Sequence, residues 1–314
     1  MACPSGDKVG EGFFPYLTAS AAALLLLLVA GILLIVFRGA WPALHTFGLA
    51  FLFETVWNPV ADVYGAAPAI LGTIITSLLA LALAGPLGVG TAIFLSELAP
   101  LWLRKPASFV VELLAAVPSI VYGLWGLFVL APIMRTVLGA WLERNLGFLP
   151  MFQGPSIGVG VLTASVVLTI VILPTITAIS REVMRAVPSE LREGMYALGA
   201  TRWEVISRIV LPNSKTGILG ALLLALGRAI GEAMAVTMVI GNANAIPTSF
   251  LAPAQTAASQ IVNEFPEAFD LHLSSLFLLG LVLLVITLVI NAGAVWLVYR
   301  TKQNAGGALI RHER

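Results

Sequence analysis

Long apolar runs dominate the chain, and six of them have the length needed to cross a bilayer. They occupy roughly 16–37, 68–95, 109–133, 157–180, 216–241 and 274–299. A membrane-spanning helix needs about 20 mainly apolar residues, so the pattern predicts an all-α integral membrane protein with six transmembrane helices. The first run is too long for the apolar part of a secretory signal, so we expect it to be retained as a span.

The composition agrees with this pattern. Hydrophobic residues make up 59% of the 314 residues and charged residues only 11%, against about 25% charged in soluble domains. The apolar runs make a lipid bilayer the expected environment. The net charge of +1 creates no strongly basic surface, so we expect no nucleic acid partner. The single cysteine, Cys3, cannot form an internal disulfide.

The basic residues orient the spans. If both termini are cytoplasmic, thirteen of the 17 Lys and Arg lie in cytoplasmic segments, and only Arg38, Arg135 and Arg144 lie outside. Basic residues near span ends are retained in the cytoplasm, so this orientation is the expected one. The remaining basic residue, Arg228, falls inside the fifth span.

These assignments divide the chain into three parts. Residues 1–15 form a cytoplasmic N-terminal tail, and residues 300–314 form a cytoplasmic C-terminal tail. Between them, 16–299 is a six-span membrane domain with a long cytoplasmic loop, 181–215. We find no internal repeat and no room for a folded soluble domain.

No catalytic or metal-binding pattern is present. His45, His272 and His312 are scattered, there is no second cysteine, and no phosphate-loop motif occurs. We therefore expect no bound metal or cofactor and no ATP hydrolysis by this chain. An intramembrane enzyme stays open as an alternative, disfavoured because no catalytic constellation is visible.

The cytoplasmic loop carries the signals of two short helices. Ser189 is an expected N-cap, with Glu190 in the first turn, and Gly199 is suited to the left-handed conformation that ends a helix. Thr201 and Glu204 form the pattern of a capping box, so a second helix should start at Arg202.

Pro212 is expected to stop this second helix, because the residue before a proline is pushed out of the α region. Apolar side chains crowd the turn between the two helices: Met195, Tyr196, Leu198 and Trp203. Such a tip is typical of a partner-binding surface, and resting at the lipid headgroups is the alternative.

The spacing of Glu193, Gly199, Ile209 and Leu211-Pro212 resembles the EAA loop of ABC importer permeases, although Gly194 and Met195 replace the two alanines. The resemblance implies the type I (MetI-like) permease fold. It also implies that the loop is a coupling helix seated on a cytoplasmic ATPase. Residues expected to make that contact are Glu193, Gly199, Arg202 and Trp203.

Several stretches resemble the PstC-type permease subunit family of phosphate importers, over roughly residues 68 to 300. They are Pro86-Leu87-Gly88, Pro118-Ser119-Ile120-Val121-Tyr122-Gly123, the segment 226–236, Ile240-Gly241-Asn242 and Val262-Asn263-Glu264-Phe265. Ala233 stands where family members often have threonine, so a hydroxyl role there is lost.

This resemblance implies a subunit that imports inorganic phosphate across a bacterial cytoplasmic (inner or plasma) membrane. It further implies a homologous second permease (PstA-type), two cytoplasmic ATPase subunits (PstB-type) that hydrolyse ATP, and an external phosphate-binding protein (PstS-type). The alternatives are import of another oxyanion such as sulfate or molybdate, an ion-gradient-driven secondary transporter, and a membrane scaffold without transport.

Arg228 and Glu232 are the expected substrate-pathway residues. A charge at mid-depth costs about 2.5–3.5 kcal/mol on insertion scales, so Arg228 should face protein or a polar path. Glu232, four residues on, should share its helix face. The pair either neutralises itself and joins helices, or binds an oxyanion, with Arg228 holding phosphate oxygens and Glu232 accepting the proton of hydrogenphosphate.

Other acidic residues are expected to play no part in the passage. Glu112, about one turn inside the third span, should reach to the interface. Glu264, Glu267 and Asp270 should form a solvated external face or meet a basic rim on a binding protein.

Overall fold

A computed structural model describes residues 8–310 and is almost entirely helical. The longer helices are α1 (Lys8–Phe47), α2 (Ala67–Ile93), α3 (Leu101–Ala116), α7 (Val161–Arg185), α10 (Leu211–Gly231) and α13 (Asp270–Ile310). The shorter ones are α4 (Ser119–Trp125), α5 (Ala131–Ile133), α6 (Gly139–Leu146), α8 (Ser189–Ala197), α9 (Arg202–Val205), α11 (Met234–Val239) and α12 (Ala257–Glu264). Strands β1 (Trp57–Asn58) and β2 (Val63–Tyr64) pair antiparallel, with Trp57 opposite Tyr64.

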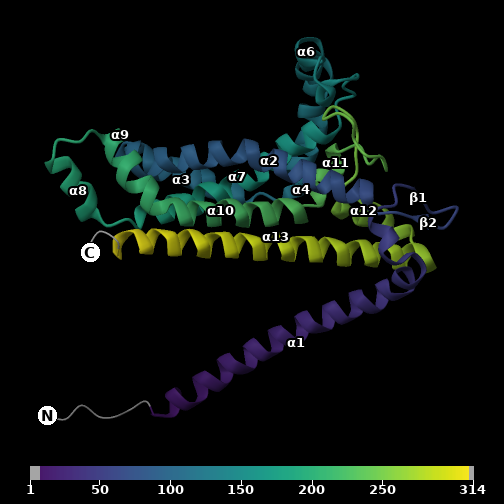
Figure 1. The fold of residues 1–314 in the computed structure, drawn as a ribbon, viewed down its shortest axis with the longest axis horizontal. Coiled ribbons are helices and arrows are strands. Elements are labelled where there is room, and N and C mark those ends of the chain that lie inside the picture. Colours follow the sequence, from purple (N-terminus) through teal and green to yellow (C-terminus); the bar gives the residue numbers. More distant parts are fainter. Residues whose placement is uncertain (1–7, 311–314) are drawn as a thin grey trace.

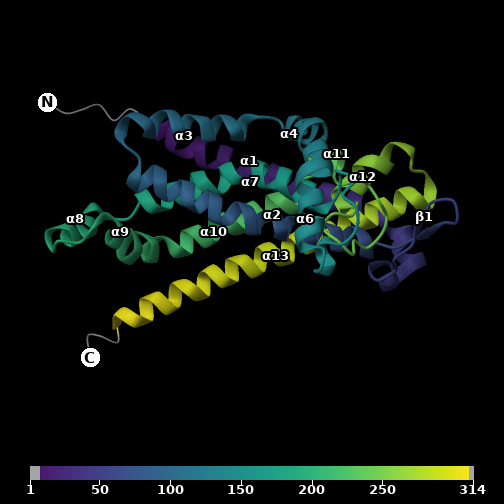
Figure 2. The ribbon, with the colours of Figure 1, turned by 90° about the horizontal axis from the view of Figure 1, so that it is seen from above.

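Helices α2, α7 and α10 pack side by side along the long axis of the molecule, as both Figure 1 and Figure 2 show. Helix α13 packs on α10, and α1 contacts α13 at one end before diverging from the bundle. Helix α1 begins, and α13 ends, at the end of the long axis that carries the α8–α9 hairpin (Figure 1). The opposite end carries β1, β2 and α12.

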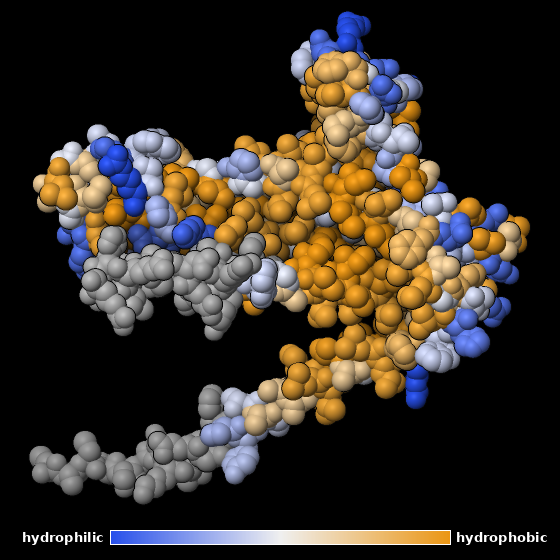
Figure 3. Space-filling model, in the orientation of Figure 1, coloured by the Kyte–Doolittle hydropathy of each residue, from blue (hydrophilic) through white to orange (hydrophobic). Residues whose placement is uncertain are grey.

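The number of spans predicted from the sequence is confirmed. Within the described residues, six helical segments are long and apolar enough to cross a membrane: Pro15–Leu52, Ala67–Leu98, Ser119–Leu146, Val161–Arg185, Arg202–Gly231 and Asp270–Gly293. On the face shown in Figure 3, apolar residues cover the middle of the bundle, whereas hydrophilic residues gather toward its two ends.

The predicted limits of the third span are wrong. Instead of one helix over 109–133, the chain forms α3 and then α4, separated at Val117 and Pro118. Val117 is extended (φ −67°, ψ 129°), because the proline that follows excludes it from the α region. Beyond α4 the chain turns away from the bundle, and α6 stands off its side (Figure 1).

Both terminal helices extend beyond the predicted spans. Helix α1 already begins at Lys8 and α13 continues to Ile310, so helical backbone enters the segments predicted as tails. The outer parts of those tails, 1–7 with Cys3 and 311–314 with His312, lie outside the described residues. The division into tails and a membrane domain stays a prediction.

Hydroxyl groups join the two central helices of the bundle. Ser165, Thr169 and Thr177 of α7 donate across to carbonyl oxygens of α2 at Thr76, Ala80 and Gly88, over 3.2–3.3 Å. Small residues bring the helices close enough for these bonds, because Ala80, Ala84 and Ala164 are all fully buried. Small interfacial residues and hydroxyl contacts of this kind stabilise helix pairs in membranes.

Glu264 corrects the expectation of a solvated acidic face. Its Oε2 accepts hydrogen bonds from Trp57 Nε1 (2.7 Å) and pairs with His272 Nε2 (2.8 Å), and its side chain is only 20% exposed. The Tyr64 ring stacks on His272. Burial, with the nearby Asp62 and Glu264 carboxylates, raises the pKa of Tyr64 to about 12, so its hydroxyl remains a donor to Asp62. This cluster fastens the β1–β2 hairpin to α12 and α13.

Gly72 offers a test of the close packing in α2. A Cβ there would collide with the backbone carbonyl of Gln255, whereas Gly90 in the same helix faces open space. We expect Gly72→Ala to destabilise the protein by about 1–3 kcal/mol through overpacking, and Gly90→Ala to leave stability unchanged or slightly raised. Thermal unfolding of both variants in detergent would check this, and equal unfolding temperatures would contradict the packing described.

Candidate functional site

Arg228 lies near the end of α10, three residues before the helix stops, and its side chain is exposed on the surface of this chain. Its Nη1 is 3.4 Å from the Thr175 hydroxyl of α7, the one hydrogen bond found for it in the described part of the chain. A charge at membrane depth requires polar surroundings. A single long bond to a hydroxyl leaves most of the guanidinium donors available.

The carboxylate of Glu232, four residues after Arg228, bonds the turn that follows α10 rather than the Arg228 guanidinium. Helix α10 ends at Gly231, and Glu232 is extended (φ −74°, ψ 113°). Its Oε1 instead accepts from the Ala235 amide (3.4 Å) at the start of α11. No ion pair joins Arg228 and Glu232 among residues 8–310. Mutual neutralisation of the pair therefore finds no support in the structure.

Two interruptions of helical backbone lie beside Arg228. One separates α3 from α4, and the other separates α10 from α11; α4 and α11 then pack on each other, with Gly123 against Ala235. Tyr122 of α4 donates to the Leu114 carbonyl across the first interruption (2.7 Å) and is close enough to Arg228 to interact with it electrostatically. At membrane depth, irregular backbone is tolerated only inside protein or beside a water-filled cavity.

The face of α10 that carries Arg228 is open. Leu224 is 62% exposed, and a Cβ added at Gly220 or Gly231 would meet nothing within 4 Å. Gly227 alone of this stripe has a near neighbour, the side-chain amide of Asn291 on α13. Gly227 and Gly231 have the G-x-x-x-G spacing that permits close helix approach, but over the described residues no neighbour packs along the whole stripe.

The cytoplasmic loop forms the predicted hairpin, with one shift at its start. Pro188, rather than Ser189, occupies the cap position of α8, and Ser189 makes no capping bond. Gly199 is left-handed (φ 83°), as expected. The capping box is confirmed, because Thr201 Oγ1 accepts from the Glu204 amide and Glu204 Oε2 accepts from the Thr201 amide.

Pro212 does not stop the second helix, contrary to the prediction. Helix α9 passes through the π-helical turn η6 (Ile206–Val210) into α10, so Arg202–Gly231 is one segment of 30 residues. The Leu211 amide bonds five residues back to Ile206. Pro212 is then the second residue of α10, a position where its missing N–H is tolerated. The hairpin is thereby joined directly to the helix of Arg228.

The four predicted coupling residues lie together on this hairpin and are all exposed: Glu193, Gly199, Arg202 and Trp203. Large apolar side chains accompany them, since Leu198 is 84% and Trp203 62% exposed. Their role in binding an ATPase stays a prediction.

Glu112 lies three turns into α3, which starts at Leu101, and its side chain is 64% exposed. It pairs with Arg181 of α7 at 3.5 Å, and Arg181 also donates to Ser108. This neutral arrangement joins α3 to α7.

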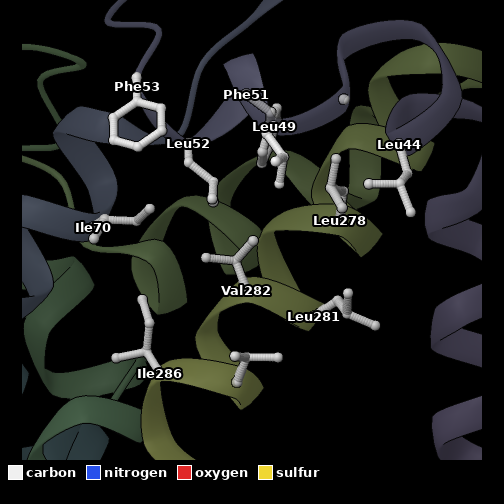
Figure 4. Close-up of a pocket in the computed structure, with 12 residues that line it drawn as sticks. Leu44, Leu49, Phe51, Leu52, Phe53, Ile70, Leu278, Leu281, Val282 and Ile286 are labelled. Carbon is white, nitrogen blue, oxygen red and sulfur yellow. The ribbon is translucent and has the colours of Figure 1, made fainter. Parts of the chain in front are cut away.

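A cavity between α1 and α13 is excluded as an anion site. It measures about 470 Å³, and side chains such as Leu52, Phe53, Ile70, Val282 and Ile286 surround it, all of them apolar (Figure 4). An oxyanion placed there would lose its hydration without gaining a hydrogen bond.

Sequence reasoning missed two polar side chains near Arg228, namely Thr175 and Tyr122. Each is a polar residue inside an apolar run, which is a recognisable signal. Which of them would lie near Arg228 depended on where the helices break.

The sequence of this chain is similar to those of known membrane transport proteins. The family model for the binding-protein-dependent transport system inner membrane component matches residues 84–303. A phosphate transport system permease protein PstC from Mesorhizobium japonicum is 48% identical, with 94% of this chain and 92% of the relative covered. The PstC of Haemophilus influenzae is 45% identical, with 94% and 95% covered.

The fold is also found among solved structures. An inward-facing structure of the MetNI methionine ABC transporter superposes with a TM-score of 0.59 at 17% identity, covering 78% of this chain and 99% of that one. The predicted MetI-like permease fold is confirmed. The chain belongs to the family of binding-protein-dependent transport system inner membrane components and, within it, to the PstC family of phosphate transport system permease proteins.

Proposed function

We propose that this chain is one permease subunit of an ATP-driven importer that carries inorganic phosphate across the bacterial cytoplasmic membrane. The observation that carries the proposal is Arg228, a cation without a carboxylate partner in the described chain, exposed between two interruptions of membrane helices. The names of the family's members supply the substrate.

Arg228 can hold two phosphate oxygens with its planar fork. Glu232, partly exposed at the next interruption, offers a carboxylate that accepts the proton of hydrogenphosphate. Sulfate carries no such proton at neutral pH, so the two side chains together favour phosphate. A passage site must also release its ion, and the open surroundings of Arg228 suit weak, transient binding.

A homologous PstA-type permease would complete the passage. The face of α10 around Arg228 is uncovered in this chain, and a second permease would line the opposite side of the passage that this face borders. Helix α1 is also exposed throughout its most apolar stretch. Both surfaces need lipid or protein against them, and only protein can supply polar groups to Arg228.

Two PstB-type ATPase subunits would drive transport from the cytoplasm. This chain has no phosphate-loop sequence and is a transport subunit, not an enzyme, so ATP is hydrolysed by its partners and no cofactor is needed here. The α8–α9 hairpin presents exposed Leu198 and Trp203 to such a partner. Closure of the ATPases would then move α10 through its continuous connection to the hairpin.

The opposite end of the bundle would receive a PstS-type phosphate-binding protein. That end carries Glu267 and Asp270 beside the β1–β2 hairpin. If the end that carries the α8–α9 hairpin lies in the cytoplasm, both termini are cytoplasmic, which agrees with the distribution of basic residues.

Replacement of Arg228 tests the passage. We expect Arg228→Gln to lower labelled phosphate uptake about 10- to 100-fold, because a hydrogen bond to a charged group contributes about 1.5–3 kcal/mol. The assay uses cells that lack their phosphate carriers, with membrane levels checked by blot. Arg144→Gln, at an exposed arginine away from the bundle, should transport normally. Undiminished uptake by Arg228→Gln would refute the assignment.

Competing anions in the same assay separate the possible substrates. Excess sulfate or molybdate should leave wild-type uptake unchanged. Inhibition by either anion would favour an importer of that oxyanion. Uptake that persists when ATP is depleted but the ion gradient is kept would favour a gradient-driven carrier.

The hairpin has its own test. Trp203→Glu places a charge on the exposed apolar tip, and we expect it to abolish co-purification of the ATPase while Arg228→Gln retains it. Glu193→Lys should weaken the same contact. If all three variants retained the ATPase equally, the coupling surface would lie elsewhere.

A further inference from the structure

A second cavity, which is polar, lies at the end of the bundle that carries the α8–α9 hairpin, far from Arg228. It measures about 610 Å³ and is enclosed by the π-helical turn η2 (Phe94–Leu98), the start of α3 and the α8–α9 hairpin. Its charged and polar lining residues are Glu97, Arg104, Tyr196 and Arg202. The cavity therefore lies between the membrane domain and the proposed coupling surface.

The one carboxylate of this cavity is already paired. Glu97 Oε1 lies 3.1 Å from Arg192 Nη2, and the two side chains are only 12% and 18% exposed. Arg192 also donates to the carbonyls of Met184 and Val187, each at 2.7 Å. Glu97 is thus neutralised, and the guanidinium groups of Arg104 and Arg202 leave the cavity with excess positive charge.

The donors that face this cavity lack acceptors. Arg104 makes one long bond, from Nη2 to the Ala99 carbonyl (3.4 Å), and its buried Nε has no partner in the described chain. Over the same residues, no hydrogen bond or ion pair is found for Arg202 or for the Tyr196 hydroxyl. An anion with several oxygens would satisfy these donors together.

The cavity lies where the second apolar segment ends and the fifth begins, on the side of the bundle that carries the α8–α9 hairpin. The second apolar segment ends at Leu98 and the fifth begins at Arg202. Next to them, Leu101 and Trp102 are 81% and 76% exposed, as is typical of residues at a membrane interface. The opening is thus within reach of both lipid phosphates and phosphate in solution.

We propose that this cavity binds a phosphate oxyanion, either the headgroup of an anionic phospholipid or inorganic phosphate, through Arg104, Tyr196 and Arg202. Arginine forks match phosphate geometry. A bound phosphate would bridge α3 to the first residue of α9 and so hold the hairpin against the membrane domain. This site is spatially separate from the passage site at Arg228, because Arg202 lies about 39 Å from Arg228 along the helix.

Hydrogen exchange of the full-length chain in lipid nanodiscs tests this inference. One arm compares phosphatidylcholine discs with discs containing phosphatidylglycerol. The other adds inorganic phosphate to phosphatidylcholine discs, with chloride at equal ionic strength as its control. At least one arm should slow amide exchange in residues 189–204 by about tenfold, the effect of a single charge-assisted contact. The arm that responds identifies the source of the phosphate.

Variants make the assignment specific. Arg104→Gln with Arg202→Gln should remove the protection, Tyr196→Phe should reduce it, and Arg104→Lys should retain part of it while preserving the charge. Arg208→Gln, an exposed arginine of the same helical segment that does not line the cavity, is the matched control and should respond like wild type. Circular dichroism confirms that each variant is folded.

Three outcomes would overturn the proposal. The first is unchanged exchange in both arms with wild type. The second is equal protection in the folded double variant and in wild type. The third is protection that appears only after the partner ATPase is added, which would assign the cavity to a protein contact.

Discussion

The guanidinium of Arg228 is the constraint around which the membrane part of this protein is arranged. A charge at that depth is costly unless polar groups or water reach it, and among the described residues only the Thr175 hydroxyl lies within hydrogen-bond distance. Helical backbone is interrupted nearby, between α3 and α4 and between α10 and α11. Such an arrangement is stable only if the open face of α10 meets a polar path or a partner that completes one.

The same helix that carries Arg228 begins at the proposed coupling surface. Because Pro212 is accommodated after a π-helical turn, the chain runs without a helical break from Arg202 to Gly231, about 44 Å. A displacement of the hairpin can therefore reach the passage without a flexible joint. Glu97 and Arg192 fasten the base of the α8–α9 hairpin to the π-helical turn η2 that follows α2, so movement there is resisted by a partly buried ion pair.

Much of this architecture could be predicted from the sequence, because its signals are local. Six apolar runs predicted six spans, and Gly199, Thr201 and Glu204 predicted the hairpin turn and its cap. The errors arose where tertiary packing decides the outcome. Pro118 ends a helix whereas Pro212 does not, and Glu232 bonds the Ala235 amide instead of pairing with Arg228. Glu264 is held by Trp57, which is 207 residues away, and no local pattern indicates that contact.

Accessibility of the α10 face tests the central claim most directly. With Cys3 replaced by serine, single cysteines would be introduced at Gly231 and Leu224 on the open face, and at the fully buried Ala225 as control. Reaction with a small, charged, membrane-impermeant thiol reagent would then be measured in the assembled importer. We expect the Gly231 and Leu224 cysteines to react, more slowly when phosphate is present, and the Ala225 cysteine to stay unreacted. If the Gly231 and Leu224 cysteines stayed unreacted both with and without ATP, the face would be sealed and Arg228 would line no aqueous passage.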